Sequence, residues 1–320
     1  MLLSLNFHTF GKAIINLTMS VLFDDFKSWK SYCEEKNLSF FEPVLEYEER
    51  QKGRKAADTW NGLSQAYQVM CDAINTGLKE DMTSRSGMVN NGGKKVFNNK
   101  LSVLSPEFQK LIARTLAAKE VNSCMGRIVA APTAGASGIL PGVLYTLQEI
   151  HNLDNQKILE ALLVAAGIGL VIEKRASLAG AVGGCQAETG SAAAMASGAI
   201  VYCLGGNITQ ILNAVAITIQ CTLGLICDPV AGLVEVPCIV RNASAASIAY
   251  SSAQIALSDV DSVIPADECV EAMGEIGQSM ESRYKETAMG GLAVTSTGQK
   301  ISKRVLIQDI EILPDQDNHP

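Results

Sequence analysis

The amino-acid sequence predicts an all-α fold in which helices alternate with glycine-rich loops. Apolar residues make up 48% of the 320 residues but aromatic residues only 5%, so small and aliphatic side chains must build the core. Such side chains let helices approach one another closely. Several segments carry apolar residues at helical spacing, and only RVLIQDIEIL, near the carboxyl end, alternates as a β-strand does. These observations favour a helical body over a β-sandwich.

The first clear helix is predicted over residues 55–78. Its apolar residues recur every three or four positions and stop near Gly77; they are Trp60, Leu63, Tyr67, Met70 and Ile74. Residues 83–99 are rich in Gly, Asn and Ser and show no period, which predicts a long loop. Long ordered loops inside compact domains are often functional.

Further helices are marked by residues that cap or open a first turn. Ser105 before Pro106 predicts a helix that runs to about residue 128. The glycine- and proline-rich segment 130–142 interrupts the helices, and Asp154 or Asn155 then caps a helix to about residue 174.

The second half of the chain contains two more predicted helices. Asn207 begins one that ends at the CDPVAG turn, residues 227–232, and Pro265 opens the other. The apolar face of this last helix comprises Val270, Met273, Ile276 and Met280.

The chain is predicted to form one helical domain over residues 19–320. Residues 1–18 faintly resemble a signal peptide, but their only cation, Lys12, lies inside the stretch instead of ahead of an apolar core. Met19 offers a second start, so we treat residues 1–18 as an N-terminal extension outside the fold. The longest apolar runs, 161–172 and 211–226, are shorter than the roughly 20 residues of a membrane span. Both are expected to be buried helices, and no membrane partner is expected.

Charge and cysteine content narrow the functional classes. The net charge is −7 with no dense stripe of Lys and Arg, so nucleic acid is not an expected partner. Nine cysteines are spread through apolar segments of a long chain, which indicates free thiols in a reducing compartment and predicts a cytoplasmic protein.

Cys185, in the segment GGCQAETGSA, is the first candidate for chemistry. A disulfide, a packed core thiol, a nucleophile or a metal ligand would each explain it, and a lone thiol is more often structural. The chain contains no C-x-x-C pair of the kind found in zinc ribbons. A Cys–His nucleophilic pair is disfavoured, because His8 and His319 lie near the ends of the sequence and His151 in a charged turn.

Two other glycine- or proline-containing loops carry candidate groups. PTAGASG, within 130–142, resembles a phosphate cradle but lacks the Lys-Ser/Thr ending of a P-loop. Cys227 and Cys238 flank DPVAGLVEVP, whose prolines and glycine make a rigid excursion that can bring both thiols to one point. With nine cysteines, residue types alone leave the choice of a ligand set open.

Four segments together resemble a known family. APTAGASGILPG, GGCQAETGSA, CDPVAGLVEVPCIVRNA and SRYKETAMGGLAVTSTG are similar to the signature blocks of iron–sulfur L-serine dehydratases. The resemblance is to the alpha chain of the two-subunit bacterial form, and it extends from about residue 20 to about residue 300. It implies a helical catalytic domain whose glycine-rich loops carry the cluster ligands.

The resemblance implies a 4Fe-4S cluster held by Cys185, Cys227 and Cys238. Three thiolate ligands leave one iron open to act as a Lewis acid. The implied reaction converts L-serine to pyruvate and ammonia by removal of the α-proton and loss of water. No pyridoxal phosphate is then required.

Further residues receive roles within this frame. Glu188 is a candidate base. Asp228 is a candidate support for the cluster, although an Asp-Pro turn also explains this residue. Arg241 is a candidate partner of the substrate carboxylate, although a structural ion pair is an equal alternative. The expected substrate-binding residues are Thr133, Gly135, Ser137 and Asn242. Ser84 and Ser86 are weaker candidates.

The resemblance also implies a beta chain as partner, because single-chain members carry an extra domain with a Ser/His-rich motif that this sequence does not contain. Two alternatives are an iron–sulfur cysteine desulfidase and a non-catalytic cluster-binding relative. One departure from the family pattern keeps the latter open: RASLAGA stands where NASISGA is common, which places Arg175 at an asparagine position.

Overall fold

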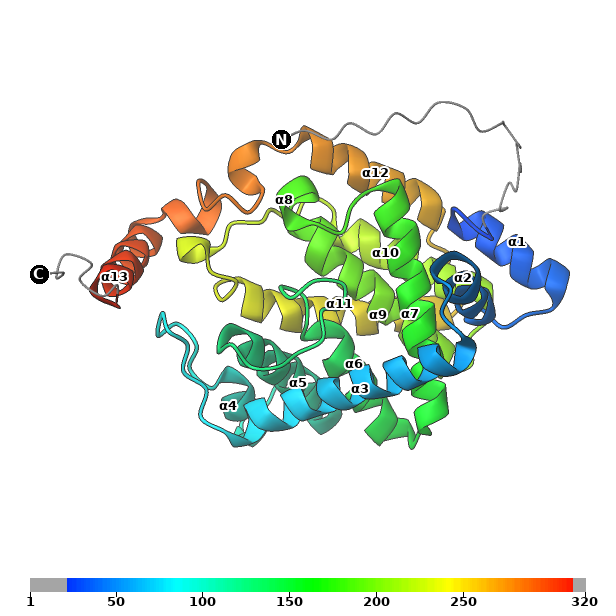
Figure 1. The fold of residues 1–320 in the computed structure, drawn as a ribbon, viewed down its shortest axis with the longest axis horizontal. Coiled ribbons are helices and arrows are strands. Elements are labelled where there is room, and N and C mark those ends of the chain that lie inside the picture. The colour runs from blue at the N-terminus through cyan, green and yellow to red at the C-terminus, as the bar shows by residue number, and fades with distance from the viewer. Residues whose placement is uncertain (1–21, 313–320) are drawn as a thin grey trace, which may run out of the picture.

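The computed structural model describes residues 22–312, with side chains to residue 307, and the predicted all-α class is confirmed (Figure 1). The expected extension 1–18 lies outside the described residues. Over the described part the α-helices are α1 (Phe26–Lys36), α2 (Glu42–Lys52), α3 (Ala56–Lys79), α4 (Gly92–Asn98), α5 (Pro106–Ser123), α6 (Ile139–His151), α7 (Asn155–Arg175), α8 (Gly180–Gly183), α9 (Ser191–Cys203), α10 (Ile208–Thr222), α11 (Cys238–Leu257), α12 (Ala266–Ser279) and α13 (Ser296–Ile312). A π-helix, η1 (Gln186–Gly190), and three short 3-10 turns, η2 (Val230–Gly232), η3 (Ser282–Tyr284) and η4 (Gly291–Val294), complete the described elements.

Helix α9 forms the centre of the molecule. All of its residues except Tyr202 are buried, and it packs against α6, α7, α10 and α11 (Figure 1). Its sequence is rich in Ala, Ser and Gly, and these small side chains allow neighbouring helices to approach it on every side. Gly198, for example, faces the side chains of Ile168 on α7 and Ile211 on α10.

The capping signals placed most helix starts correctly. The Ser105 hydroxyl accepts the Phe108 amide at 3.3 Å, and Asp154 accepts the Lys157 amide at 2.7 Å. Asn207 forms a capping box with Gln210 at the start of α10. The predicted helix ends were less accurate. Helix α5 ends at Ser123 instead of at about residue 128, and α10 ends at Thr222, before the predicted turn at 227–232.

Two predictions of secondary structure were wrong. The described part of the strand-like run, residues 304–312, belongs to α13, whose first turn is capped where Thr295 accepts the Gly298 amide at 3.1 Å. The loop predicted over 83–99 contains α4. Its first amides, of Gly92 and Gly93, donate to the Glu120 carboxylate on α5 at 2.6 and 3.0 Å, so a residue distant in sequence caps this helix.

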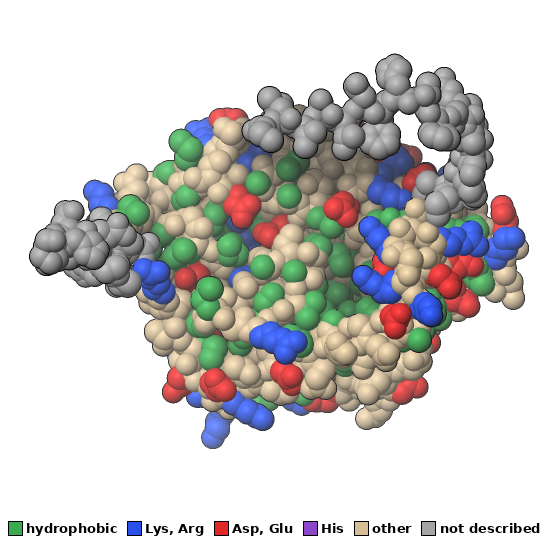
Figure 2. All heavy atoms as spheres, viewed as in Figure 1, with side chains coloured by type: hydrophobic (Ala, Val, Ile, Leu, Met, Phe, Trp, Pro, Cys, Tyr) green, Lys and Arg blue, Asp and Glu red, His purple; other side chains and the backbone are tan. Residues whose placement is uncertain are grey.

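Helix α7 is long and apolar enough to cross a bilayer, but 67% of its most apolar window is buried in the fold. This burial is typical of the core helix of a globular protein. On the face shown in Figure 2, acidic and basic side chains are interspersed and do not gather into a basic stripe.

Candidate active site

The three thiols named by the family resemblance come from three different elements. Cys185 precedes η1, Cys227 lies between α10 and η2, and Cys238 is the first residue of α11. Their exposed fractions are 2%, 3% and 6%, and all nine cysteines of the chain are free. A disulfide is therefore not the reason for Cys185.

The three thiols lie within electrostatic range of one another. Burial raises the pKa of Cys227 and that of Cys238, the latter to about 12, and the charge of Cys185 raises both further. Within the described residues, no three His, Cys, Asp or Glu side chains are arranged to hold a single metal ion. A donor set made only of thiolates fits an iron–sulfur cluster, in which each thiolate binds a separate iron.

Arg241 and Asp228 form an ion pair beside these thiols. Arg241 Nη1 lies 2.9 Å from Asp228 Oδ1 and donates to the Ile226 carbonyl at 2.9 Å. Asp228 Oδ1 has no aligned hydrogen bond, so the contact is electrostatic, while Oδ2 accepts the Leu292 amide at 2.7 Å. Burial raises the pKa of Cys185, and the Arg241 charge opposes that rise. A cation is thus already in place beside a thiol that must be a thiolate to bind metal.

Glu188 and the 133–138 turn meet on another side of the site. Glu188 lies on η1 and is 8% exposed; the Thr133 hydroxyl donates to its carboxylate. A Cβ at Gly135 would lie against the same carboxylate, so any larger residue there would force the Glu188 side chain to move. Burial raises the pKa of Glu188, although the Thr133 hydrogen bond partly offsets this effect.

Asn242 holds the 133–138 turn against α11. Its Nδ2 donates to the carbonyls of Gly135 and Cys238 at 2.8 and 2.9 Å, and its Oδ1 accepts the Gly138 amide at 3.0 Å. The side chain is fully buried, so its amide positions the backbone around Cys238. Ser137 is 1% exposed, and its hydroxyl has no hydrogen-bond partner among the described residues.

Ser84 and Ser86, the weaker candidates, bind a carboxylate in the segment between Cys227 and Cys238. Their hydroxyls donate to Glu235 Oε2 at 2.7 and 2.6 Å. All three side chains are buried. The loop that contains the serines is therefore attached to the loop that precedes Cys238, and the serines are engaged in that attachment.

Lys119 was missed by the sequence analysis. It is fully buried on α5, and its ammonium donates to the Val234 carbonyl at 2.8 Å and to Asn122 Oδ1 at 2.7 Å. Burial lowers the pKa of Lys119 to about 8, while the charges of Cys238 and Glu188 act in the opposite direction. The available signal was a lysine within the apolar run LIARTLAAK.

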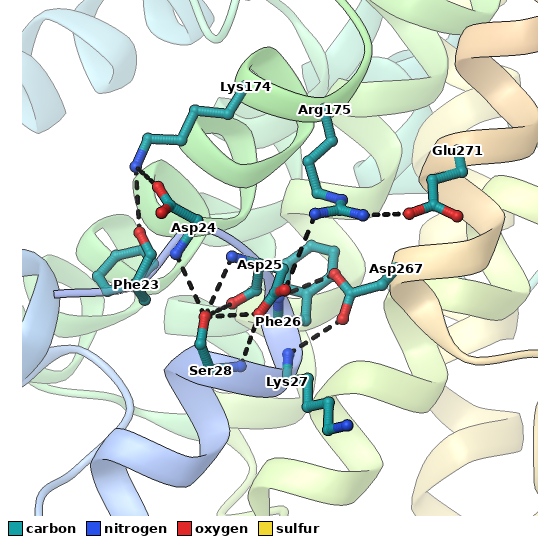
Figure 3. A network of polar contacts seen from close by, with 10 residues as sticks. All are labelled: Phe23, Asp24, Asp25, Phe26, Lys27, Ser28, Lys174, Arg175, Asp267 and Glu271. Atoms are coloured by element: carbon teal, nitrogen blue, oxygen red, sulfur yellow. Dashed lines mark hydrogen bonds and ion pairs between the residues drawn. The ribbon is translucent and has the colours of Figure 1, made fainter. Parts of the chain in front are cut away.

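The departure at Arg175 has a structural role. Arg175, at the end of α7, pairs with Glu271 on α12, and its Nη1 lies 3.8 Å from Asp25 before α1 (Figure 3). In the same network, Asp267 of α12 accepts the amides of Phe26 and Lys27 at 2.9 and 3.0 Å. The arginine thus joins helices at a partly exposed surface.

The comparisons with known proteins agree on one family. The profile described as "Serine dehydratase alpha chain" matches residues 35–293. The L-serine dehydratase alpha chain of Peptoniphilus asaccharolyticus is 43% identical over 86% of this chain and 95% of its own length. A probable L-serine dehydratase alpha chain of Bacillus subtilis is 38% identical over 89% of this chain and 95% of its own length. The L-serine dehydratase of Streptomyces coelicolor is 37% identical, and the match covers 58% of its length.

Proposed function

Since the chain belongs to the serine dehydratase alpha chain family, we propose that it is the catalytic chain of an L-serine ammonia-lyase. The observation that carries the proposal is the convergence of three buried thiols from separate elements beside the Arg241–Asp228 pair. The names of the relatives supply the substrate, L-serine, and the reaction class, a dehydration.

Cys185, Cys227 and Cys238 are the residues that would hold a 4Fe-4S cluster. When bound, such a cluster supplies a Lewis-acidic iron that polarises the substrate hydroxyl group. Arg241 lowers the cost of ionising Cys185, and the Asn242 hydrogen bonds fix the backbone at Cys238. Asp228 holds Arg241 in place, which gives it a supporting role in this proposal.

The remaining groups bind the substrate and move its proton. The part of the Arg241 guanidinium not used by Asp228 and Ile226 is the partner for the substrate carboxylate. Thr133, Gly135 and Ser137 line the turn that faces Glu188, and the free Ser137 hydroxyl is available to a ligand. Glu188 accepts the α-proton, a role suited to a buried carboxyl group whose pKa is raised. Loss of the hydroxyl group as water leaves aminoacrylate, which rearranges and hydrolyses to pyruvate and ammonia.

A separate beta chain is the proposed partner. The two first relatives are named alpha chains and match this chain over nearly their whole length, whereas the Streptomyces coelicolor enzyme extends well beyond the matched part. Assay of the reconstituted chain alone and with its beta chain tests this point. We expect serine turnover to rise strongly on mixing, and full activity of the isolated chain would contradict the need for a partner.

Anaerobic reconstitution with iron and sulfide tests the cluster and the reaction. We expect brown absorbance, about four irons for each chain, and release of pyruvate from L-serine by the complex with the beta chain. Cys227→Ser should abolish the absorbance or make it labile. Cys269→Ser is the matched control, since Cys269 is equally buried but lies on α12 and binds Gln220.

Two outcomes would contradict these assignments. Full retention of the cluster in Cys227→Ser would remove Cys227 from the ligand set. Faster release of pyruvate from L-cysteine, with sulfide as co-product, than from L-serine would favour the desulfidase alternative.

A further inference from the structure

The segment 284–292 is attached to the thiol-bearing loop at both of its ends. At one end, the Cys227 amide donates to the Tyr284 carbonyl at 2.8 Å, and the Glu286 amide donates to the Cys227 carbonyl at 2.9 Å. At the other end, the Leu292 amide donates to Asp228 at 2.7 Å. Residues far apart in sequence are thereby fixed beside Cys227.

The backbone of this segment is held in uncommon conformations. Glu286, Ala288 and Gly291 have φ angles of 63°, 55° and 58°. For residues with a side chain, the left-handed region costs energy, and it persists only where surrounding contacts impose it. The hydrogen bonds to Cys227 on either side of residue 285 are such contacts, and they fix the direction in which Glu286 leaves the backbone.

The Glu286 carboxylate faces the site. A methyl group placed on Gly180 would lie 3.3 Å from Cys227 Sγ and 3.4 Å from Glu286 Oε2, so thiol and carboxylate border one point. The charge of Glu286 also acts on Cys227 and on Glu188. In the part of the chain that the structure describes, the Glu286 carboxylate makes no hydrogen bond or ion pair, and the side chain is solvent-exposed.

The other charged groups of the site are already engaged. Glu188 is hydrogen-bonded by Thr133 and enclosed by Gly135, and Asp228 is paired with Arg241. An α-amino acid brings two charges of opposite sign. Arg241 is the proposed partner of the substrate carboxylate, and binding of the substrate ammonium group requires an anionic side chain of the protein.

We propose that Glu286 binds the α-ammonium group of the substrate and so makes the site selective for α-amino acids over hydroxy acids that lack an amino group. The inference rests on the proposed function and adds a specificity-determining residue to it. The open side of Glu286 leaves room for a ligand to enter, and its fixed backbone lowers the entropy lost on binding.

The test compares L-serine with 3-hydroxypropionate, which has the same carboxylate and hydroxyl groups but no ammonium group. In the reconstituted complex, Glu286→Gln should raise the KM for L-serine about tenfold or more, because a charge-assisted hydrogen bond becomes a neutral one. The inhibition constant of 3-hydroxypropionate should stay within about twofold, which corresponds to a small fraction of the binding free energy. Glu281→Gln is the matched control, because Glu281 lies just outside the segment and pairs with Arg283 at the surface.

A second readout is independent of turnover. L-alanine and propionate lack the hydroxyl group and cannot be dehydrated, and their binding is measured by ligand-observed NMR titration. Glu286→Gln should weaken L-alanine and spare propionate. Equal weakening of both acids, or no weakening of either, would overturn the role of Glu286. A wild-type complex that binds L-alanine selectively but never turns over L-serine would instead count against the proposed function.

Discussion

Two polar networks join distant segments of this chain, and they differ in their access to water. At the surface, Arg175 links α7 to Glu271 on α12 and to Asp25, with side chains 29%, 51% and 31% exposed (Figure 3). At the site, Arg241 pairs with Asp228, whose side chain is only 2% exposed. Both networks pair an arginine with a carboxylate, so residue type does not predict how much each contributes to stability. Burial does predict it, because an unpaired buried charge costs far more free energy than an exposed one.

Removal of the two arginines should give the largest contrast. Arg241→Met strands Asp228 as a buried charge with only the Leu292 amide, and should cost about 3 kcal/mol of unfolding free energy. Arg175→Met removes a partly exposed pair and should cost less than about 1 kcal/mol. Urea unfolding of the cluster-free proteins measures both values. Equal costs would show that burial does not distinguish the networks.

A glycine substitution tests how tightly the site network is packed. Gly291→Ala places a Cβ against the Asp228 carboxylate at a φ of 58°, whereas Gly205→Ala meets open space at a φ of 78°. Both substitutions place alanine in the left-handed region, which costs about 1 kcal/mol of unfolding free energy. We expect Gly291→Ala to cost about 2 kcal/mol more than the control, because the carboxylate must move. Similar unfolding free energies for the two variants would mean that Asp228 has room to shift.

Acid titration should produce the smallest effects, of opposite sign for two carboxylates of the surface network. Burial alone would raise the pKa of Asp25, but hydrogen bonds from the Ser28 hydroxyl and amide, with the Arg175 charge, lower it below 3.8. The ionised Asp25 carboxylate stabilises the fold above pH 3.8. This stabilisation is lost as the pH falls through the pKa of Asp25 in the folded state, which lies below its pKa in the unfolded state. Burial raises the pKa of Asp267 above 3.8, so its protonation makes the folded state relatively more stable as the pH falls toward 3.8.

The measurement is the unfolding free energy of wild type and two variants between pH 6 and about pH 3. On acidification, Asp25→Asn should lose less stability than wild type, and Asp267→Asn should lose more. Parallel pH curves for all three proteins would show that neither carboxyl group has a shifted pKa in the folded state.

Local signals in the sequence predicted several of the amphipathic and capped helices. The period from Trp60 to Ile74 identified α3, and Ser105, Asp154 and Asn207 marked the starts of α5, α7 and α10. Helix α9 gave no period to detect, because it is buried on nearly every face. The start of α4 depends on Glu120, a tertiary contact that no local pattern reveals.

The candidate site was only partly accessible to sequence reasoning. Cys185, Cys227 and Cys238 could be named by family resemblance, whereas residue types alone left the ligand set open. Glu286 was inside a recognised block, SRYKETAMGGLAVTSTG, but its place beside Cys227 depends on backbone pairing across a long separation in sequence. Lys119 looked like an ordinary helix residue, and only its full burial sets it apart.

The π-helix η1 has a consequence for how Cys185 can change its surroundings. A π-turn contains one residue more than an α-turn, so η1 adds an offset between Cys185 and the first turn of α9. Deletion of one residue there would restore α-helical winding and rotate Cys185 by about 100° around the axis, while α9 kept its packing. The extra residue of the π-turn therefore sets the direction in which Cys185 points relative to the packed faces of α9.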